Sequence, residues 1–264
     1  MKYLNIILFF ICFSVNAQQD FELPKEAKAF VVKGFKAYDY VEGDINADGK
    51  KDAILVLKYV LQPSDTLDYE ERYYTYPVLL LLRNHHGKLE LKFKADSVLS
   101  NMSSPKYYGY IETDTIFKNN FTISTWGGRR YKWRMEYVFK YNVEKKEFYL
   151  FKETQSNFSP PDSESEKDEI IIFKADELPY IKFQDYNEDK DFYESYSEAL
   201  VKVPKTYFYS NPDLKSNPRK AFVMKGDKLG VTSQTKNFVQ VYFTNKQDKS
   251  TSGFILKKDL QLIK

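Results

Sequence analysis

The sequence contains almost no cysteine and very little histidine. Its one cysteine, Cys12, lies in an apolar N-terminal stretch, and its two histidines are the adjacent His85 and His86. Removal of that stretch as a targeting segment leaves no cysteine, which excludes disulfides, thiolate zinc sites and cysteine nucleophiles. The histidines stand at a turn, without a third ligand at a recognisable spacing, so we interpret them as exposed turn residues.

An excess of one charge sign is also missing. The chain has 40 Lys and Arg residues against 37 Asp and Glu residues, and loss of Lys2 with the targeting segment leaves 39 against 37. This near-neutral balance gives no electrostatic reason to expect a nucleic-acid partner.

The N-terminus has the three parts of a signal peptide. Lys2 supplies a positive charge, Leu4 to Val15 is mostly apolar, and Val15-Asn16-Ala17 is a small-x-small cleavage site. The apolar run is about a dozen residues, shorter than the roughly 20 of a membrane-spanning helix. Cys12 raises a lipoprotein as the alternative, but no small-residue lipobox precedes it. We expect residues 1–17 to be cleaved and the mature protein to have no membrane span. We expect this protein to be periplasmic, attached to the cell surface or secreted.

Aromatic residues are abundant, with 22 Tyr and 21 Phe, and they favour half-buried pleated surfaces. Apolar or alternating segments with intervening turns predict antiparallel strands. We expect them at 29–40, 53–60, 76–82, 89–94, 113–118, 121–125, 131–141, 148–152 and 169–173. The predicted fold class is therefore mainly β, with an antiparallel β-rich domain over residues 18–155 and a surface loop at 62–74.

The remainder of the chain divides into a connecting segment and a small domain. Residues 156–202 contain Pro160-Pro161 and a run of Ser and Glu, which is typical of a linker. Within it, apolar residues at helical spacing predict a helix over 188–200. Short strands over 203–264 predict a small barrel.

The densest pattern of chemistry-bearing residues lies between Gly43 and Asp52. Asp44, Asn46, Asp48 and Asp52 place side-chain oxygens at loop positions 1, 3, 5 and 9, and Lys50 offers a carbonyl at position 7. Gly49 stands at position 6, where the chain must turn sharply. Hard oxygen donors in this arrangement predict a structural Ca²⁺ site, and a solvated turn without metal is the alternative.

A similar run begins at Asp185 and continues through Asn187, Asp189 and Asp191. It has Lys190 where the turning glycine should be, so we interpret it as a solvated acidic face.

The first loop resembles the FG-GAP/VCBS type of calcium loop, which leads straight into a strand. It differs from an EF-hand because position 12 is Leu55 instead of a bidentate Glu. The region up to Lys152, with its Trp126-Gly127-Gly128 motif, also resembles a family of exported bacterial β-proteins. That family implies no established activity.

Residues 203–264 resemble a bacterial SH3-like (SH3b) domain. The resemblance is carried by Tyr207-Phe208-Tyr209, Lys225-Gly226-Asp227, Phe238 to Val241, Gly253-Phe254-Ile255 and Asp259-Leu260. It implies binding of a cell-wall peptide or a protein, or packing against a neighbouring domain. The family usually has Trp where Phe254 stands, which weakens the expectation of an aromatic ligand groove.

The sequence contains no motif that assigns a reaction. It has no Gly-x-Ser-x-Gly nucleophile elbow, and paired carboxylates for glycoside hydrolysis cannot be located from sequence. We therefore expect an exported, non-enzymatic binding protein with structural calcium. The alternatives are a cell-wall-associated hydrolase or accessory targeted by the SH3-like domain, and a toxin-neutralising binding partner. Trp126-Gly127-Gly128 is interpreted as a core tryptophan beside a tight turn, with an exposed binding surface as the alternative.

Overall fold

Antiparallel strands make up most of the protein, which confirms the expected mainly-β fold class. The computed structural model describes residues 22–60, 76–96, 98, 110–117, 119–128, 130–160, 168–187, 196–245 and 247–264. The expected signal peptide and the loop expected at 62–74 lie outside these residues. Among the residues described, no helix combines the length and apolar character that a membrane crossing requires.

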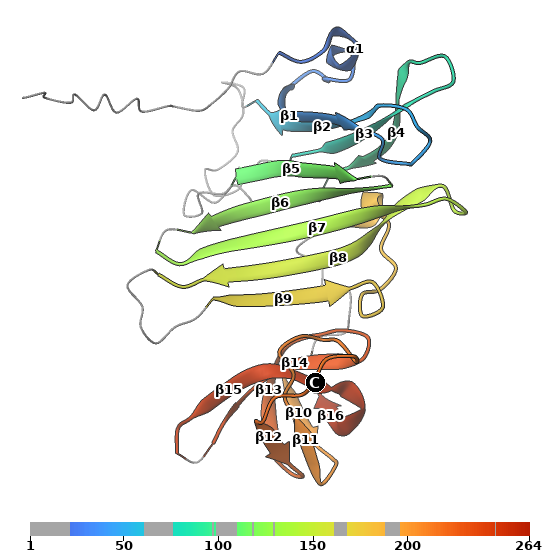
Figure 1. Cartoon of the computed structure of the whole chain (residues 1–264). Coiled ribbons are helices and arrows are strands. Elements are labelled where there is room, and N and C mark those ends of the chain that lie inside the picture. The colour runs from blue at the N-terminus through green and yellow to red at the C-terminus, as the bar shows by residue number, and fades with distance from the viewer. Residues whose placement is uncertain are drawn as a thin grey trace, which may run out of the picture.

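Two sheets build the N-terminal domain (Figure 1). The first has the order β1 (Phe35–Gly43), β2 (Asp52–Tyr59), β3 (Val78–Arg83) and β4 (Leu89–Ala95). The second has the order β5 (Tyr110–Phe117), β6 (Asn120–Gly128), β7 (Lys132–Asn142), β8 (Glu147–Phe158) and β9 (Glu169–Lys174). Each strand pairs with its sequence neighbour within its sheet, as expected for a meander of hairpins.

Strand β2 explains why residues 53–60 read as a nearly continuous apolar run. Ile54 and Val56 belong to a core cluster shared with the second sheet. Leu55 and Leu57 point to the opposite face and pack with Ala27 of the short helix α1 (Lys25–Lys28). Because successive side chains of a strand alternate between faces, a strand covered on both sides must be apolar throughout.

The first domain extends beyond the expected boundary at residue 155. Strand β8 continues to Phe158, and β9 pairs with it. After β9, Ile181, Phe183 and Tyr186 are buried in the core beside β6 and β7, around the short helix η1 (Phe183–Asp185). Residues 156–202 are therefore not simply a linker: their apolar side chains complete the core without following a regular period.

The C-terminal domain begins at β10 (Glu198–Val201), not at residue 203. Its main sheet has the order β15 (Ser250–Leu256), β14 (Phe238–Thr244), β13 (Lys228–Gln234), β10 and β16 (Leu260–Ile263), with η2 (Lys257–Asp259) before the last strand. A second, two-stranded sheet pairs β11 (Lys205–Tyr207) with β12 (Phe222–Met224). The expected small barrel is not closed: the described strands form these two open sheets, joined by a bridge between Tyr209 and Phe254.

The helix expected over 188–200 is wrong where the structure describes it. Residues 198–201 form β10, which pairs with both β13 and β16, and residues 188–195 lie outside the described residues. Pairing on both edges outweighs the local helical spacing.

The two domains share a buried apolar junction. Ile171 and Phe173 of β9 pack with Phe238 and Phe254 of the C-terminal domain, and the rings of Phe173 and Phe254 lie 5.9 Å apart, edge to face. Phe254 is thus covered by the first domain, so the position where an aromatic ligand groove was in question is occupied by intramolecular packing.

Candidate metal centre

The loop of residues 44–51 connects β1 to β2 and is fixed to the core at Ile45. This side chain is fully buried in the cluster shared by the two sheets. Gly49 and Ala47 both have left-handed backbone conformations, with φ of 82° and 62°. Glycine is the residue that adopts this conformation without a steric penalty, which accounts for Gly49 at the turning position.

Hydrogen bonds within the loop turn its oxygen atoms inward. The amide of Asp48 donates to Asp44 Oδ1 and to Asn46 Oδ1, both at 3.0 Å, and the amide of Gly49 donates to Asp44 Oδ2 at 3.0 Å. One carboxylate oxygen each from Asp44, Asp48 and Asp52 lies within 4.8 Å of the others. The structure therefore brings together the three carboxylates that the sequence predicted.

Asp52 is the buried member of this cluster, with no exposed surface. Its Oδ1 accepts a hydrogen bond of 2.8 Å from the amide of Arg83 at the end of β3. Its Oδ2 is buried and has no hydrogen-bond partner among the described residues. Burial raises the pKa of Asp52 to about 6. The backbone amides of Arg83 and Ile45 oppose this rise, and the negative charges of Asp48 and Asp44 add to it.

Lys50 places a positive charge beside the cluster. Its Nζ lies 3.2 Å from Asp48 Oδ2. Burial alone would raise the pKa of Asp48, but hydrogen bonds from the amide and ammonium of Lys50 outweigh it and lower that pKa. Lys50 contacts the cluster through its backbone amide and its ammonium, and the role expected for its carbonyl stays a prediction.

Two residues at this site were missed from the sequence. Arg83 anchors Asp52 through its amide, and its guanidinium pairs with both carboxylate oxygens of Glu26, at 2.8 and 3.0 Å. Tyr141 of β7 lies close enough for Asp48 and Asp52 to act on it: burial, and then these two charges, raise the pKa of its hydroxyl. No local signal could have found either residue, because strand pairing and sheet packing bring them to the loop.

The donor set fits a hard divalent cation. Three carboxylates lie together, and that of Asp52, which is fully buried, has one oxygen without a hydrogen-bond donor among the described residues. The Asn46 side-chain oxygen accepts a hydrogen bond from the amide of Asp48 in the same loop. A cation there would compensate the cost of burying the Asp52 oxygen beside two like charges. Asp44, Asn46, Asp48 and Asp52 are the side chains that would hold it.

The other candidate residues that the structure describes lie at exposed or half-buried positions. His85 and His86 are exposed in the β3–β4 turn, as expected, with ring centroids 3.8 Å apart. Asp185 is exposed, and Asp189 and Asp191 lie outside the described residues. Trp126 is half-buried in β6 and precedes a tight turn at Gly128, where an added Cβ would lie 1.9 Å from the carbonyl oxygen of Tyr131.

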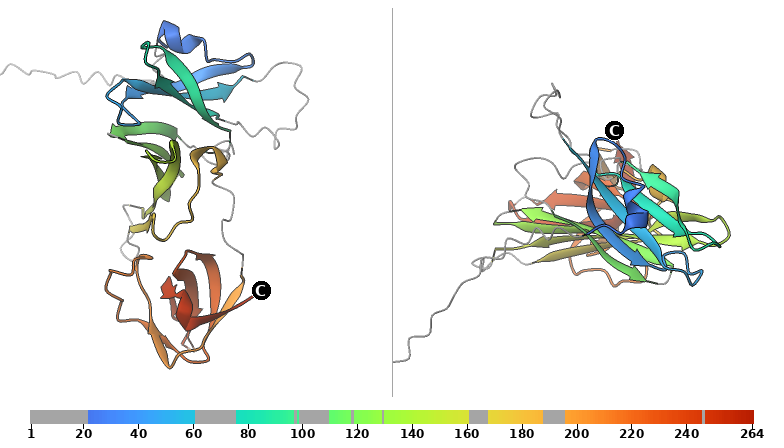
Figure 2. Two further views of the ribbon diagram at one scale, coloured as in Figure 1. Left: turned by 90° about the vertical axis from the view of Figure 1, so that its right-hand side faces the viewer. Right: turned by 90° about the horizontal axis from the view of Figure 1, so that it is seen from above.

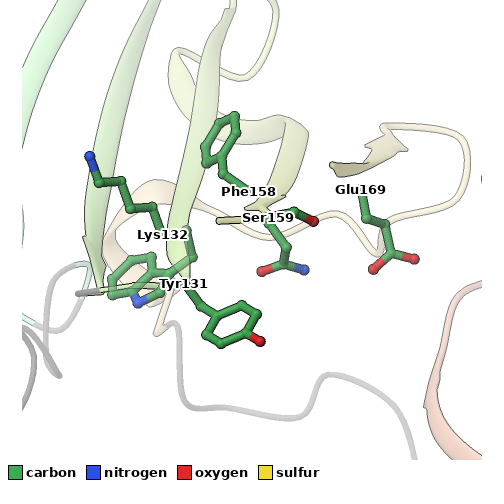
Figure 3. Close-up of a pocket in the computed structure, with 7 residues that line it drawn as sticks. Tyr131, Lys132, Phe158, Ser159 and Glu169 are labelled. Atoms are coloured by element: carbon green, nitrogen blue, oxygen red, sulfur yellow. The ribbon is translucent and has the colours of Figure 1, made fainter. Parts of the chain in front are cut away.

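A hollow of about 340 Å³ lies at one end of β7 and β8. Figure 3 shows the exposed rings of Tyr131 and Phe158 beside it, with the charged ends of Lys132 and Glu169 pointing away from one another. Its described lining contains a single carboxylate, that of Glu169. Glycoside hydrolysis needs two carboxylates facing the scissile bond, so these residues do not assign that reaction to the hollow.

Comparison with known proteins gives this chain no relatives: no family model, no curated protein and no solved structure matches it.

Proposed function

We propose that the protein is an exported, non-enzymatic binding protein whose N-terminal domain is held together by a Ca²⁺ ion in the 44–52 loop. In this proposal the C-terminal domain is an SH3-like module that carries recognition. Calcium here is structural, because the loop leads into a buried strand and supplies no bidentate Glu of the kind a sensor loop carries.

The observation that carries the proposal is the buried Oδ2 of Asp52, which has no hydrogen-bond partner among the described residues and belongs to a carboxylate that lies beside those of Asp44 and Asp48. Buried charges in proteins are paired or coordinate metals, since an isolated one costs several kcal/mol, of the order of 5. The ammonium of Lys50 contacts Asp48, and the Arg83 amide contacts the other oxygen of Asp52. A bound cation would satisfy Oδ2 of Asp52 and tie the β1–β2 connection to the end of β3.

Isothermal titration of the protein with Ca²⁺ and with Mg²⁺ tests the metal site. We expect one site that prefers Ca²⁺, because a flexible loop of oxygen donors suits its higher coordination number better than the strict octahedron of Mg²⁺. Asp44→Asn and Asp52→Asn should weaken binding at least tenfold. Asp96→Asn is the matched control, since it removes one negative charge from an exposed carboxylate paired with Lys94, away from the loop.

Absence of Ca²⁺ binding by the wild type would overturn the proposal. Equal losses in Asp96→Asn and Asp52→Asn would also overturn it, because the effect would then be one of net charge and not of coordination.

A further inference from the structure

The near-neutral charge of the whole chain conceals a segregation between its two domains. Residues 196–264 contain 13 Lys and Arg against 5 Asp and Glu, a formal net charge of +8. Residues 1–195 contain 27 against 32, a net charge of −5. Such a distribution attracts the C-terminal domain towards anionic surfaces and turns the N-terminal domain away from them.

The two-stranded sheet of the C-terminal domain exposes apolar side chains on one face. Lys205 pairs with Met224 and Tyr207 pairs with Phe222, so these four side chains share a face, which we call the β11–β12 face. Tyr207, Phe222 and Met224 are 38%, 47% and 48% exposed, whereas Thr206 and Val223 between them are buried.

Lys205 lies against this apolar surface, and further exposed lysines lie close to the two strands in sequence. The Nζ of Lys205 lies 3.8 Å from the ring centroid of Phe222 and 4.8 Å from that of Tyr207. Four further lysines are exposed within or beside the adjoining segments: Lys202, Lys220, Lys225 and Lys228. Within the described part of the chain, no salt bridge involves any of these five ammonium groups.

Two carboxylates that contact these strands are engaged internally. Asp227 accepts a 2.8 Å hydrogen bond from the amide of Met224, and Asp259 accepts one of 2.7 Å from Thr206 Oγ1. The lysines therefore keep their charge available for an external anion. The β11–β12 pair also lies at the end of the molecule opposite α1 in both side views (Figures 1 and 2).

We propose that the β11–β12 face docks the protein on the surface of an anionic lipid bilayer. Lipid phosphates match the lysines, while the rings of Tyr207 and Phe222 and the thioether of Met224 suit the boundary between headgroups and acyl chains. This mixture of aromatic and aliphatic side chains favours a bilayer over nucleic acid, for which stacked rings and phosphate contacts carry the binding. The inference specifies the recognition role proposed for the C-terminal domain and is independent of the calcium loop.

Flotation of the protein with vesicles tests this docking. We expect binding to phosphatidylcholine vesicles that contain phosphatidylglycerol, little binding to phosphatidylcholine alone, and weakening by salt. The double variant F222S/M224S should bind at least tenfold more weakly, and K220Q/K225Q should bind more weakly with a shallower salt dependence. All four positions are exposed, so both variants should fold as the wild type does.

Two matched controls separate docking from general effects. Y131S/V143S changes two comparably exposed apolar residues of the N-terminal domain, and K88Q/K92Q removes two lysines there. Both control variants should bind vesicles as the wild type does.

Two results would overturn the inference: an equal loss of vesicle binding in the controls, or a wild-type protein that does not bind anionic vesicles. DNA binding as tight as vesicle binding and unaffected by F222S/M224S would instead assign a nucleic-acid surface. If the protein binds Ca²⁺ as expected but does not float with anionic vesicles, only the docking inference is overturned.

Discussion

The carboxylate of Asp52 should destabilise the folded protein without metal and stabilise it when a metal ion is bound. Without a cation its carboxylate is buried beside two like charges, and in the proposed calcium site it would be the buried ligand. The same substitution should therefore change stability in opposite directions in the two conditions.

Asp52→Asn should raise the free energy of unfolding in chelator by roughly 2 kcal/mol, because it removes a desolvated charge and keeps an oxygen for the Arg83 amide. In saturating Ca²⁺ it should be less stable than the wild type, because the stabilisation by bound metal is lost. Urea denaturation of both proteins in both buffers measures the crossover. A variant that is destabilised in chelator as well would contradict this description of the site.

Gly128 is held in a conformation that only glycine tolerates. Its φ is +93°, and a Cβ would lie 1.9 Å from the carbonyl oxygen of Tyr131. Gly128→Ala should lower the free energy of unfolding by roughly 2 kcal/mol or more. Gly87→Ala is the control, because Gly87 has a φ of +76° but no atom within 4 Å of the added Cβ, so it should lose only about 1 kcal/mol. Equal losses of stability in Gly128→Ala and Gly87→Ala, measured by chemical denaturation, would contradict the close approach of the backbone at Gly128.

Among single residues, the clustering of the loop carboxylates was predictable and the residues that support them were not. Asp44, Asp48 and Asp52 lie close together in one short loop of the chain, so their spacing in the sequence was enough to predict that they meet. Arg83 and Tyr141 reach the site through the pairing of β2 with β3 and the packing of the two sheets, and neither is visible in local sequence.

Among the elements, β8 carries a carboxylate on its core side. Glu153 pairs with Tyr137 on one neighbouring strand and with Phe173 on the other, and both partners are buried. Burial raises the pKa of Glu153, and a hydrogen bond of 2.8 Å from Gln155 Nε2 only partly opposes this.

The sign of the resulting pH dependence follows from the raised pKa. The folded protein binds this proton more tightly than the unfolded chain, so the stability it contributes is present below the ordinary value of 4.5 and is lost as pH rises through the folded pKa. Glu153→Gln should therefore be more stable than the wild type at pH 7, and the difference should shrink towards pH 4.5. Glu144→Gln, in the exposed β7–β8 turn, is the control. A pH-independent difference would refute the linkage.

Most strands were predictable because their apolar residues either form a continuous run or alternate with a period of two. The strands expected at 53–60, 76–82, 89–94 and 131–141 are confirmed as β2, β3, β4 and β7. The segment after β9 was not predictable: Ile181, Phe183 and Tyr186 enter the core from an irregular connection, and an irregular connection has no period to detect.

For the whole molecule, Glu177 joins the two domains. It is almost fully buried, and its carboxylate accepts hydrogen bonds from Thr235 Oγ1, the Asn237 amide and Asn237 Nδ2, at 2.8, 2.9 and 2.8 Å. Lys174 and Asp213 add an ion pair across the same junction. Together with the packing of Phe173 on Phe254, these contacts should make the domains unfold together.

Glu177→Ala should weaken this coupling by about 2–3 kcal/mol, because it leaves buried donors without an acceptor. The tryptophans, Trp126 and Trp133, both lie in the N-terminal domain, so their fluorescence reports that domain while circular dichroism reports the whole chain. The two midpoints should coincide in the wild type and separate in Glu177→Ala. Asp176→Ala, at an exposed neighbouring position, should leave them together. Midpoints that coincide in every variant would refute the role of Glu177.

Charge segregation shows why averages over a sequence mislead. The near-neutral composition, which gave no electrostatic reason to expect a nucleic-acid partner, sums a basic domain with an acidic remainder. The opposite net charges of the two parts become visible when the chain is divided at the domain boundary before β10.

The thermal stability of the whole protein in Ca²⁺ and in chelator tests the central claim, that a metal ion holds the N-terminal domain together. At a Ca²⁺ concentration 100-fold above Kd the gain is about 2.7 kcal/mol, which corresponds to a rise in Tm of roughly 5 °C or more. We predict this rise for the wild type and for Asp96→Asn, and no rise for Asp44→Asn or Asp52→Asn. Superimposable melting curves of the wild type in Ca²⁺ and in chelator would contradict the claim.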